Sequence, residues 1–236
     1  MPEIFGHVPE RALAVYAHPD DPDVSCGGTL AAWAKAGCRV RILLCTDGAK
    51  GTTTATADAG ALRRQRAEEA TAAAATLGAA GADSLGYPDG EVVDGPALQR
   101  QLVEAVRRHR PEVVLAPDPS AMFFGQDYFN HRDHRVVGLA VLDAVAPAAA
   151  LPLYFPDAGP PHQVATVLLS GTLEPDAWVD ISGTIEVKEA AVGCHRSQFP
   201  EGGDWASAAV YLGAEDAGRQ CGVRYAEAFR MLRLGG

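Results

Sequence analysis

Short apolar runs alternate with longer stretches of helical periodicity along most of the 236-residue chain. The apolar runs predict buried strands at residues 12–17, 39–46, 112–119, 165–171 and 177–182, with a short strand within 83–90 that leads into a turn. The helical stretches cover residues 27–37, 59–78, 96–111, 134–146 and 183–198, the last helix that we predict. Alternation of this kind predicts an α/β fold with a mostly parallel sheet and helices on both faces. Because no internal repeat or low-complexity linker interrupts it, we expect residues 1–236 to form a single domain.

Four polar loops that contain Gly or Asp follow the first four predicted strands. Their sequences are "YAHPDDPDVSCGG" (16–28), "CTDG" (45–48), "GYPDG" (86–90) and "APDPSAMFFGQDYFNHRDH" (116–134). In open α/β sheets, ligands bind beyond the carboxyl ends of the strands. The four loops therefore predict one ligand site at one rim of the sheet.

Charge and cysteine usage narrow the class of protein. The net charge of −10 argues against nucleic acid or an anionic membrane as the main partner. No apolar run approaches the ~18 residues of a membrane span, and the first residues lack a secretory pattern. The five cysteines are odd in number and show no CxxC spacing. We therefore expect reduced thiols, a cytoplasmic location, and neither a disulfide framework nor a cysteine zinc site.

Two histidine motifs predict a metal site. His18 and Asp21 are three residues apart, and so are His131 and His134, at the start of a predicted helix. One imidazole, one carboxylate and a second imidazole leave a position open for water, as in catalytic zinc sites. Asp20 is then a spare carboxylate that could accept a proton from the water, and the spare histidine of "HRDH" could stabilise charge.

Each motif also has a simpler interpretation. "HPDD" alone could be the exit from a strand into a helix cap, and "HRDH" alone could be a polar helix start. Asp47 and Asp89 lie in glycine-containing turns that turn chemistry could explain, although they share the rim with the other loops. Gly27 and Gly28 are not part of a recognisable phosphate-binding motif, so we interpret them as glycines that allow close packing. Taken together at one rim, the two histidine motifs favour a metal site.

The combination of "AHPDD" with "HRDH" resembles the zinc-dependent de-N-acetylases of the PIG-L/LmbE-like family. The segments "CTDGAKG", "GYPDG", "KEAAVGCHRSQ" and "GVRYAEAF" are similar to segments of the same family, so the resemblance spans nearly the whole chain. It implies a Rossmann-like three-layer α/β fold. It also implies hydrolysis of an N-acyl group, usually an acetyl group on an amino sugar, with Zn²⁺ as cofactor and Fe²⁺ or another divalent metal as the alternative.

The resemblance also implies roles at the metal. His18, Asp21 and His134 would be the ligands, and Asp20 would be the general base. His131 would stabilise the oxyanion or act as the general acid. Whether Asp20 or His131 protonates the leaving amine stays open.

Further roles implied by the resemblance concern the surroundings of the metal. Asp133 would orient His131, and Asp89 would contact the substrate. The substrate-contacting arginine of the helix "RRQRAEEA" best matches Arg66, with Arg63 and Arg64 as alternatives. We include Asp47 among the candidate substrate contacts because its loop shares the rim.

Two positions depart from the family pattern. Many members have Glu after the paired aspartates, where this chain has Pro22. Some sugar deacetylases carry a tyrosine two residues before the first histidine of the pair, where this chain has Phe129. The adjacent Tyr128 could take over that role, or the oxyanion could be held by the metal and His131 alone.

The sequence thus predicts a metal-dependent amide hydrolase for a small-molecule N-acylated amino sugar. Two alternatives are another mononuclear metalloenzyme, such as a non-haem iron enzyme, and a sugar- or nucleotide-binding α/β domain without catalysis. A spare base at Asp20 argues against the latter, because binding alone does not require it. The aromatic cluster "MFFGQDYF" suggests a substrate with an apolar portion. A homo-oligomer is possible, and we expect no nucleic-acid or membrane partner.

Overall fold

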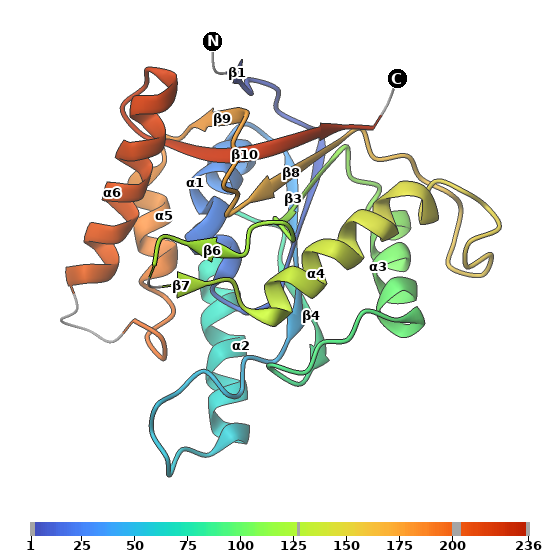
Figure 1. Ribbon diagram of the computed structural model, residues 1–236, viewed down its shortest axis with the longest axis horizontal. Helices are drawn as coiled ribbons and strands as arrows, with labels where there is room; N and C mark the ends of the chain where they lie inside the picture. Colours follow the sequence, from blue (N-terminus) through green and yellow to red (C-terminus); the bar gives the residue numbers. More distant parts are fainter. Residues whose placement is uncertain (1–2, 127, 200–203, 235–236) are drawn as a thin grey trace.

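The computed structural model describes residues 3–126, 128–199 and 204–234 (Figure 1). In this part of the chain, eight strands form one sheet in the order β1-β9-β10-β8-β5-β2-β3-β4. The strands of the sheet are β1 (Glu3–Ile4), β2 (Arg11–Tyr16), β3 (Arg39–Thr46), β4 (Ala82–Tyr87), β5 (Val113–Pro117), β8 (Thr166–Ser170), β9 (Ala177–Asp180) and β10 (Ala226–Arg233). A separate antiparallel hairpin joins β6 (Phe123–Phe124) to β7 (Tyr128–Phe129).

The sheet is mostly parallel, as predicted. All neighbouring strands run parallel except β10, which is antiparallel to both β8 and β9. β3 lies on one side of β2 and β5 on the other, so the direction of strand addition reverses at β2. Such a reversal opens a crevice at the carboxyl ends of the strands, where ligands bind in open α/β folds.

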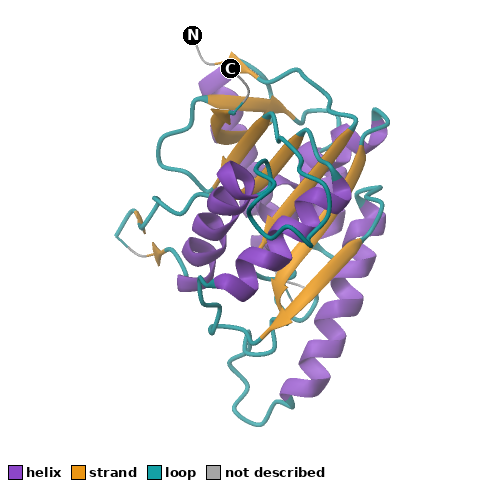
Figure 2. Cartoon of the chain, turned by 90° about the vertical axis from the view of Figure 1, so that its right-hand side faces the viewer, coloured by secondary structure: helices purple, strands orange, loops and turns teal. Residues whose placement is uncertain are grey.

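Helices cover both faces of the sheet, which confirms the predicted three-layer α/β architecture (Figure 2). One face packs against α1 (Asp21–Lys35), α2 (Ala59–Thr76), α5 (Ile185–Val192) and α6 (Asp204–Cys221). The other packs against α3 (Pro96–His109), α4 (Arg132–Asp143) and the short π-helix η1 (Ala144–Ala148).

Strand alternation explains why the sheet is buried on both sides. In β2, Ala14 and Tyr16 point into the layer of α1 and α2, whereas Leu13 and Val15 point into the layer of α3 and α4. A strand that is buried on both faces reads as a continuous apolar run, and this is why "ALAVY" was recognisable in the sequence.

Several predicted boundaries differ from the observed ones. The helix predicted at 183–198 ends at Val192, and both α6 and β10 lie beyond the last predicted helix. The helix predicted at 27–37 begins earlier, at Asp21, and is interrupted at Cys26 by non-helical backbone angles. The helix predicted at 134–146 is α4, which begins earlier, at Arg132, and continues into η1.

A buried carboxylate on β10 explains how α1 tolerates its interruption. Glu227 accepts hydrogen bonds from the backbone N–H groups of Gly28 (2.9 Å) and Thr29 (2.8 Å) and is paired with Lys188 (2.5 Å). Backbone N–H groups at the start of a helix have no acceptor within the helix, so they need an acceptor of this kind. A Cβ on Gly28 would lie 2.7 Å from the Ile181 side chain, so Gly28 packs closely against its neighbour, as expected from the sequence.

Among the described residues, no helix combines the length and apolar character needed to cross a bilayer. The five cysteines are all free, and Cys26, Cys38 and Cys45 are buried. Cys26 contacts the Tyr16 hydroxyl at 3.3 Å. Cys26, Cys38 and Cys45 therefore belong to the packed interior.

Candidate active site

A cavity of about 540 Å³ opens at the carboxyl ends of the central strands. Three of the four polar loops predicted to share a rim, 16–28, 86–90 and 116–134, contribute to its lining. The loop after β3 contributes through Lys50 and Gly51, just beyond the predicted segment 45–48. Residues that line the cavity include His18, Asp20, Asp21, Val24, Ser25, Lys50, Gly51, Arg66, Asp89, Tyr128, Asn130, His131, His134, Gly171, Gln198 and Phe199. The two histidine motifs, 113 positions apart from His18 to His131, thus meet in one place because β2 and β5 are neighbours in the sheet.

The side chains of His18, Asp21 and His134 converge at the cavity wall. His18 Nδ1 lies 3.0 Å from His134 Nε2 and 3.3 Å from Asp21 Oδ2. The other Asp21 oxygen, Oδ1, lies 3.1 Å from His134 Nε2. Adjacent ligand atoms of a tetrahedral zinc with bonds of about 2.0–2.1 Å are about 3.3–3.4 Å apart. The three donors therefore have the spacing of metal ligands.

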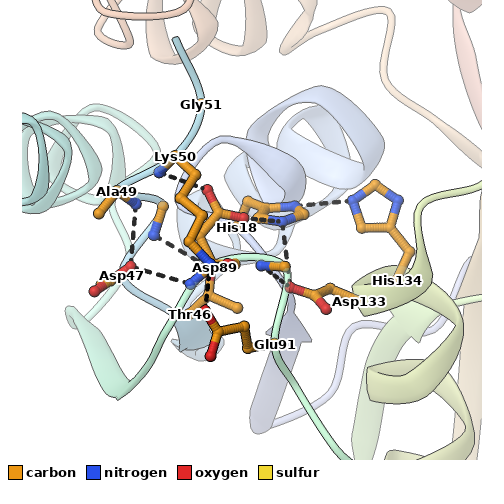
Figure 3. Close-up of polar contacts among 12 residues, drawn as sticks. His18, Thr46, Asp47, Ala49, Lys50, Gly51, Asp89, Glu91, Asp133 and His134 are labelled. Carbon is orange, nitrogen blue, oxygen red and sulfur yellow. Dashed lines mark hydrogen bonds and ion pairs between the residues drawn. The ribbon is translucent and has the colours of Figure 1, made fainter. Parts of the chain in front are cut away.

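The outer nitrogens of the two histidines both contact side-chain oxygens, and the pair of His18 with Asp89 is drawn in Figure 3. His134 Nδ1 lies 3.0 Å from Asn130 Oδ1, and His18 Nε2 lies 3.2 Å from Asp89 Oδ1. If each outer nitrogen donates to its oxygen, the inner nitrogens carry lone pairs that face each other and Asp21. Two lone pairs and a carboxylate at this distance repel unless a cation lies between them, so the donor set fits a metal ion.

The electrostatics of the cluster also favour a cation. Burial alone would lower the pKa of His18, but the carboxylates of Asp21 and Asp89 outweigh it and raise the pKa to about 10. Burial would raise the pKa of Asp21, whereas His134 and His18 hold it well below its usual value. Positive charge is thus stabilised where the three donors meet.

Other groupings around His18 are geometrically possible. Ligand atoms of His18, His131 and His134 lie within 4.8 Å of one another, as do those of His18, Asp89 and Asp133. We favour Asp21 over His131 as the third donor because its oxygens contact both partner nitrogens at 3.1–3.3 Å. Asp89 and Asp133 approach the opposite ring nitrogen, Nε2, at 3.2 and 3.8 Å.

Asp20 is directed away from this cluster and toward Arg66. Its Oδ1 forms an ion pair with Arg66 Nη2, while Arg66 Nη1 donates to the Gly48 carbonyl at 2.9 Å. Arg66 is 2% exposed, so its guanidinium is fixed in the wall of the cavity. Gly48 and Gly51 make room for it, because a Cβ on either would lie within 2.8 Å of the guanidinium. The carboxylate of Asp20 retains Oδ2 for another partner.

His131 lies on the open side of the cavity. Its ring stacks on His134 with centroids 5.0 Å apart, and the Tyr128 ring is 5.7 Å away. Burial and the neighbouring His134 and His18 lower the pKa of His131, which favours the neutral imidazole at pH 7. A neutral imidazole still offers one N–H donor.

The remaining predicted residues take different positions. Asp133 Oδ2 accepts the Gly90 N–H (2.8 Å) and faces His18, and its Oδ1 is buried without a partner, so Asp133 does not contact His131 here. Asp47 does not line the cavity. Its Oδ1 accepts from Ala49 N–H and its Oδ2 pairs with Arg63, which fits the turn role considered for it.

Asn130 is a site residue that sequence reasoning missed. It is buried, and its Nδ2 donates to the Ala121 carbonyl (2.9 Å), which fixes Oδ1 beside His134. Its position four residues before His134, next to the "HRDH" motif, was the available signal. Lys50 was missed too, and it donates its backbone N–H to Asp89 Oδ2 (3.0 Å).

A comparison with protein families identifies this arrangement. The family model for PIG-L, described as GlcNAc-PI de-N-acetylase, matches residues 13–145, which include both histidine motifs. The chain belongs to the PIG-L family.

Curated relatives and solved structures of PIG-L type agree with this assignment. The chain is 35% identical to a diacetylchitobiose deacetylase of Thermococcus kodakarensis, over 94% of this chain and 83% of the relative. It is 31% identical to a 1D-myo-inositol 2-acetamido-2-deoxy-alpha-D-glucopyranoside deacetylase of Rhodococcus opacus, over 83% and 85%. The structure of N,N'-diacetylchitobiose deacetylase from Pyrococcus horikoshii superposes with a TM-score of 0.87 at 30% identity, over 95% of this chain and 84% of that one. This PIG-L protein is therefore an enzyme, an amide hydrolase of the N-deacetylase type.

Proposed function

We propose that the protein removes the acetyl group from a small N-acetylated amino sugar with the help of one zinc ion. The observation that carries the proposal is the convergence of His18 Nδ1, His134 Nε2 and the Asp21 carboxylate, with Asp20 free of that cluster. The deacetylase names of the relatives support the substrate class. We also propose that residues 1–236 act as one catalytic domain.

His18, Asp21 and His134 would hold the metal. When bound, such a metal supplies a Lewis acid that polarises the amide carbonyl and lowers the pKa of water. Three protein donors leave a position for substrate or water. His134 would donate its outer N–H to Asn130, and His18 would donate its outer N–H to Asp89. The lone pair on the other nitrogen of each ring would then be directed at the metal.

Asp20 would accept the proton of the attacking water. Arg66 anchors its Oδ1, and Asp20 lines the cavity. The proton can afterwards pass from Asp20 to the leaving amine, as a general base becomes the general acid of the next step. His131 would then donate an N–H to the negative charge that develops on the amide oxygen, with Tyr128 beside it.

The cavity walls would bind the sugar. Asp89 and Arg66 line the cavity, as do Lys50 and Gln198. Because the guanidinium of Arg66 is already held by Asp20 and Gly48, we propose that its main effect is on Asp20 rather than on the substrate. The five free thiols support a reducing, cytoplasmic compartment as the place of action.

The proposal is tested by acetate release from a panel of N-acetylated amino sugars, with elemental analysis of the same protein. We expect about one zinc per chain and acetate from at least one N-acetylglucosamine derivative. Full metal occupancy in a His18→Ala, His134→Ala double variant would contradict the ligand assignment. Iron in place of zinc, with activity only when iron is present, would favour the alternative metal.

A further inference from the structure

A second cavity, of about 430 Å³, adjoins the active site and has no role in the mechanism above. We call it the α6 groove. It runs between α6, α5, the start of α1, the segment that follows β8 and the strand β10. Of these, α5 and α6 lie at the left of Figure 1. Its volume falls within the range of about 300–1,000 Å³ that is usual for ligand pockets.

The groove is continuous with the active-site cavity. Val24, Ser25, Gly171 and Phe199 line both. Val24 and Ser25 follow the proposed ligand Asp21 by three and four residues on α1, so they lie on its helical face. A molecule that places an amide at the metal donors can therefore extend past Ser25 into the groove without leaving the protein surface.

The lining of the groove is mostly apolar. Most of the residues that α6 contributes are small or apolar: Trp205, Ala206, Ala209, Val210, Gly213, Ala214 and Ala217. Three charged residues line the groove. Lys188 and Glu227 are paired with each other and are about 5% exposed, and Asp216 is exposed and paired with Arg219 at 2.8 Å. Apolar surface of this kind favours an uncharged, apolar group.

Trp205 and Phe199 form an aromatic edge of the groove. Their ring centroids are 5.5 Å apart at an angle of 61°. Trp205 is 58% exposed, although a large aromatic side chain gains from burial. Val24, at the junction of the two cavities, is also exposed. An apolar group in the groove would remove both of these surfaces from water.

We propose that the substrate is an N-acetylated amino sugar with an apolar aglycone, an alkyl or aryl group, and that the α6 groove binds this aglycone. The inference rests on the proposed function. An acetyl group has only one carbon beyond its carbonyl, so the acyl side is too short to reach past Ser25. The group in the groove must then belong to the amine side of the amide, which carries the sugar.

The structure offers a variant that fills the groove without straining the fold. Gly213 lines the groove from within α6, and a Cβ there would meet no atom within 4 Å. Gly213→Leu therefore occupies the groove and also replaces a glycine inside a helix, which favours the helix. Ala208→Leu is the matched control, because Ala208 lies on the exposed face of the same helix outside the groove.

The test compares acetate release from the methyl and hexyl glycosides of N-acetylglucosamine. We expect kcat/KM of the wild-type protein to be about tenfold higher for the hexyl glycoside, mainly through KM. Gly213→Leu should lose this preference and keep its activity on the methyl glycoside, and Ala208→Leu should behave as wild type. Equal kcat/KM for the two glycosides in the wild-type protein would overturn the proposal.

Fluorescence gives a second readout that does not depend on turnover. Trp205 is exposed, whereas Trp33 and Trp178 are buried, so a probe in the groove should change mainly the Trp205 emission. We expect hexyl glucosaminide, which has no acetyl group to lose, to change the emission saturably in wild type and not in Gly213→Leu. No change in wild type would contradict the proposal.

The remaining outcomes distinguish the other occupants. A preference for N-hexanoylglucosamine over N-acetylglucosamine that Gly213→Leu abolishes would assign the groove to the acyl chain. A change in sedimentation between wild type and Gly213→Leu would assign it to a second copy of the chain. Either result overturns the aglycone proposal. Acetate release from none of the sugars would instead contradict the proposed function, while saturable binding of hexyl glucosaminide would still support the groove.

Discussion

At the scale of single residues, the adjacent carboxylates of Asp20 and Asp21 differ only in their surroundings. Asp21 lies between two imidazoles, whose positive charge or shared metal stabilises its ionised form. Asp20 faces the guanidinium of Arg66 instead. Repulsion between the two neighbours is offset because each has a different cationic partner. The same residue type can therefore serve as a ligand at one position and as a base at the next.

Substitution of each aspartate should separate these roles. Asp20→Asn should keep its metal and lower kcat by roughly 10²–10⁴, the usual contribution of a positioned general base. Asp21→Asn should bind metal more weakly, because an amide oxygen is a poorer ligand, and added zinc should partly restore its activity. Metal content, kcat and thermal melts of both variants check this. If the two variants exchanged these behaviours, the assignment of the motif would be wrong.

The loop that contains Gly51 should affect catalysis through Arg66. A Cβ at Gly51 would lie 2.6 Å from Arg66 Nη1, so Gly51→Ala should displace the guanidinium and with it Asp20. We expect kcat to fall about tenfold or more, with a smaller change in KM and in melting temperature. Gly183→Ala, where a Cβ meets nothing within 4 Å, is the control. An unchanged kcat in Gly51→Ala would show that Arg66 does not hold Asp20 in place.

The residues nearest the metal site were predictable because they share a short spacing in the sequence. His18 and Asp21 are three residues apart, and so are His131 and His134, so each pair can be recognised as a possible ligand motif. Contacts between distant segments were not predictable in the same way. The bond between Arg66 and Asp20 depends on how α2 packs against the loop after β3, and the sequence alone suggested a substrate contact instead.

At the scale of elements, the start of α1 is the part of the fold that most directly positions the site. The helix carries Asp21 in its first turn and is interrupted at Cys26. Glu227 on β10 accepts the N–H groups that the interruption leaves open, and Lys188 on α5 neutralises it. Three elements that are far apart in the sequence therefore fix the direction in which α1 leaves the metal site.

Removal of the charge on Glu227 should destabilise the protein strongly. Glu227→Gln leaves the buried ammonium of Lys188 without its carboxylate, and breaking a buried pair in this way usually lowers the free energy of unfolding by about 3–5 kcal/mol. Urea unfolding measures the change. The double variant Lys188→Met, Glu227→Gln should lose clearly less, because no unpaired charge remains. An equal loss in the single and double variants would contradict this account.

Elements with a simple apolar pattern were predicted well, and those with a mixed pattern were not. β2, β3 and β5 are buried on both faces and read as apolar runs. β10 carries Glu227 and Arg230 among its apolar residues, so its pattern suggested no buried strand. Its tertiary partners, Lys188 and the backbone N–H groups of Gly28 and Thr29, make a carboxylate acceptable at that position.

At the scale of the whole molecule, positive charge gathers at the sheet edge opposite the site. Arg11, Arg39, Arg41 and Arg108 surround a small hollow next to His109, at the amino ends of β2 and β3, although the chain has a net charge of −10. Partial burial lowers the pKa of His109, and Arg41 and Arg108 lower it further. This edge is therefore unfavourable for an additional proton.

The pKa of His109 should make stability depend on pH. Its pKa in the folded protein is below the ordinary value of 6.5, so below pH 6.5 the unfolded chain binds this proton more readily than the folded one. Stability should therefore fall as the pH drops through 6.5. Between pH 7.5 and 5.5, the melting temperature of His109→Gln should decrease less than that of the wild-type protein. Melts of the zinc-loaded proteins check this. A steeper loss in the variant would reverse the sign that we infer.

The place of β10 in the middle of the sheet has a consequence for how the protein is made. A ribosome adds roughly 5–20 residues per second, and all three proposed metal ligands precede β10 in the chain. Until residues 226–233 are synthesised, β8 and β9 each have an unpaired edge, and α1 lacks the Glu227 carboxylate. Unpaired strand edges promote aggregation. A nascent chain that stalls before β10 would thus carry all three proposed ligands and still be a target for chaperones, because β10 follows the other strands of the sheet in the chain and joins its two parts.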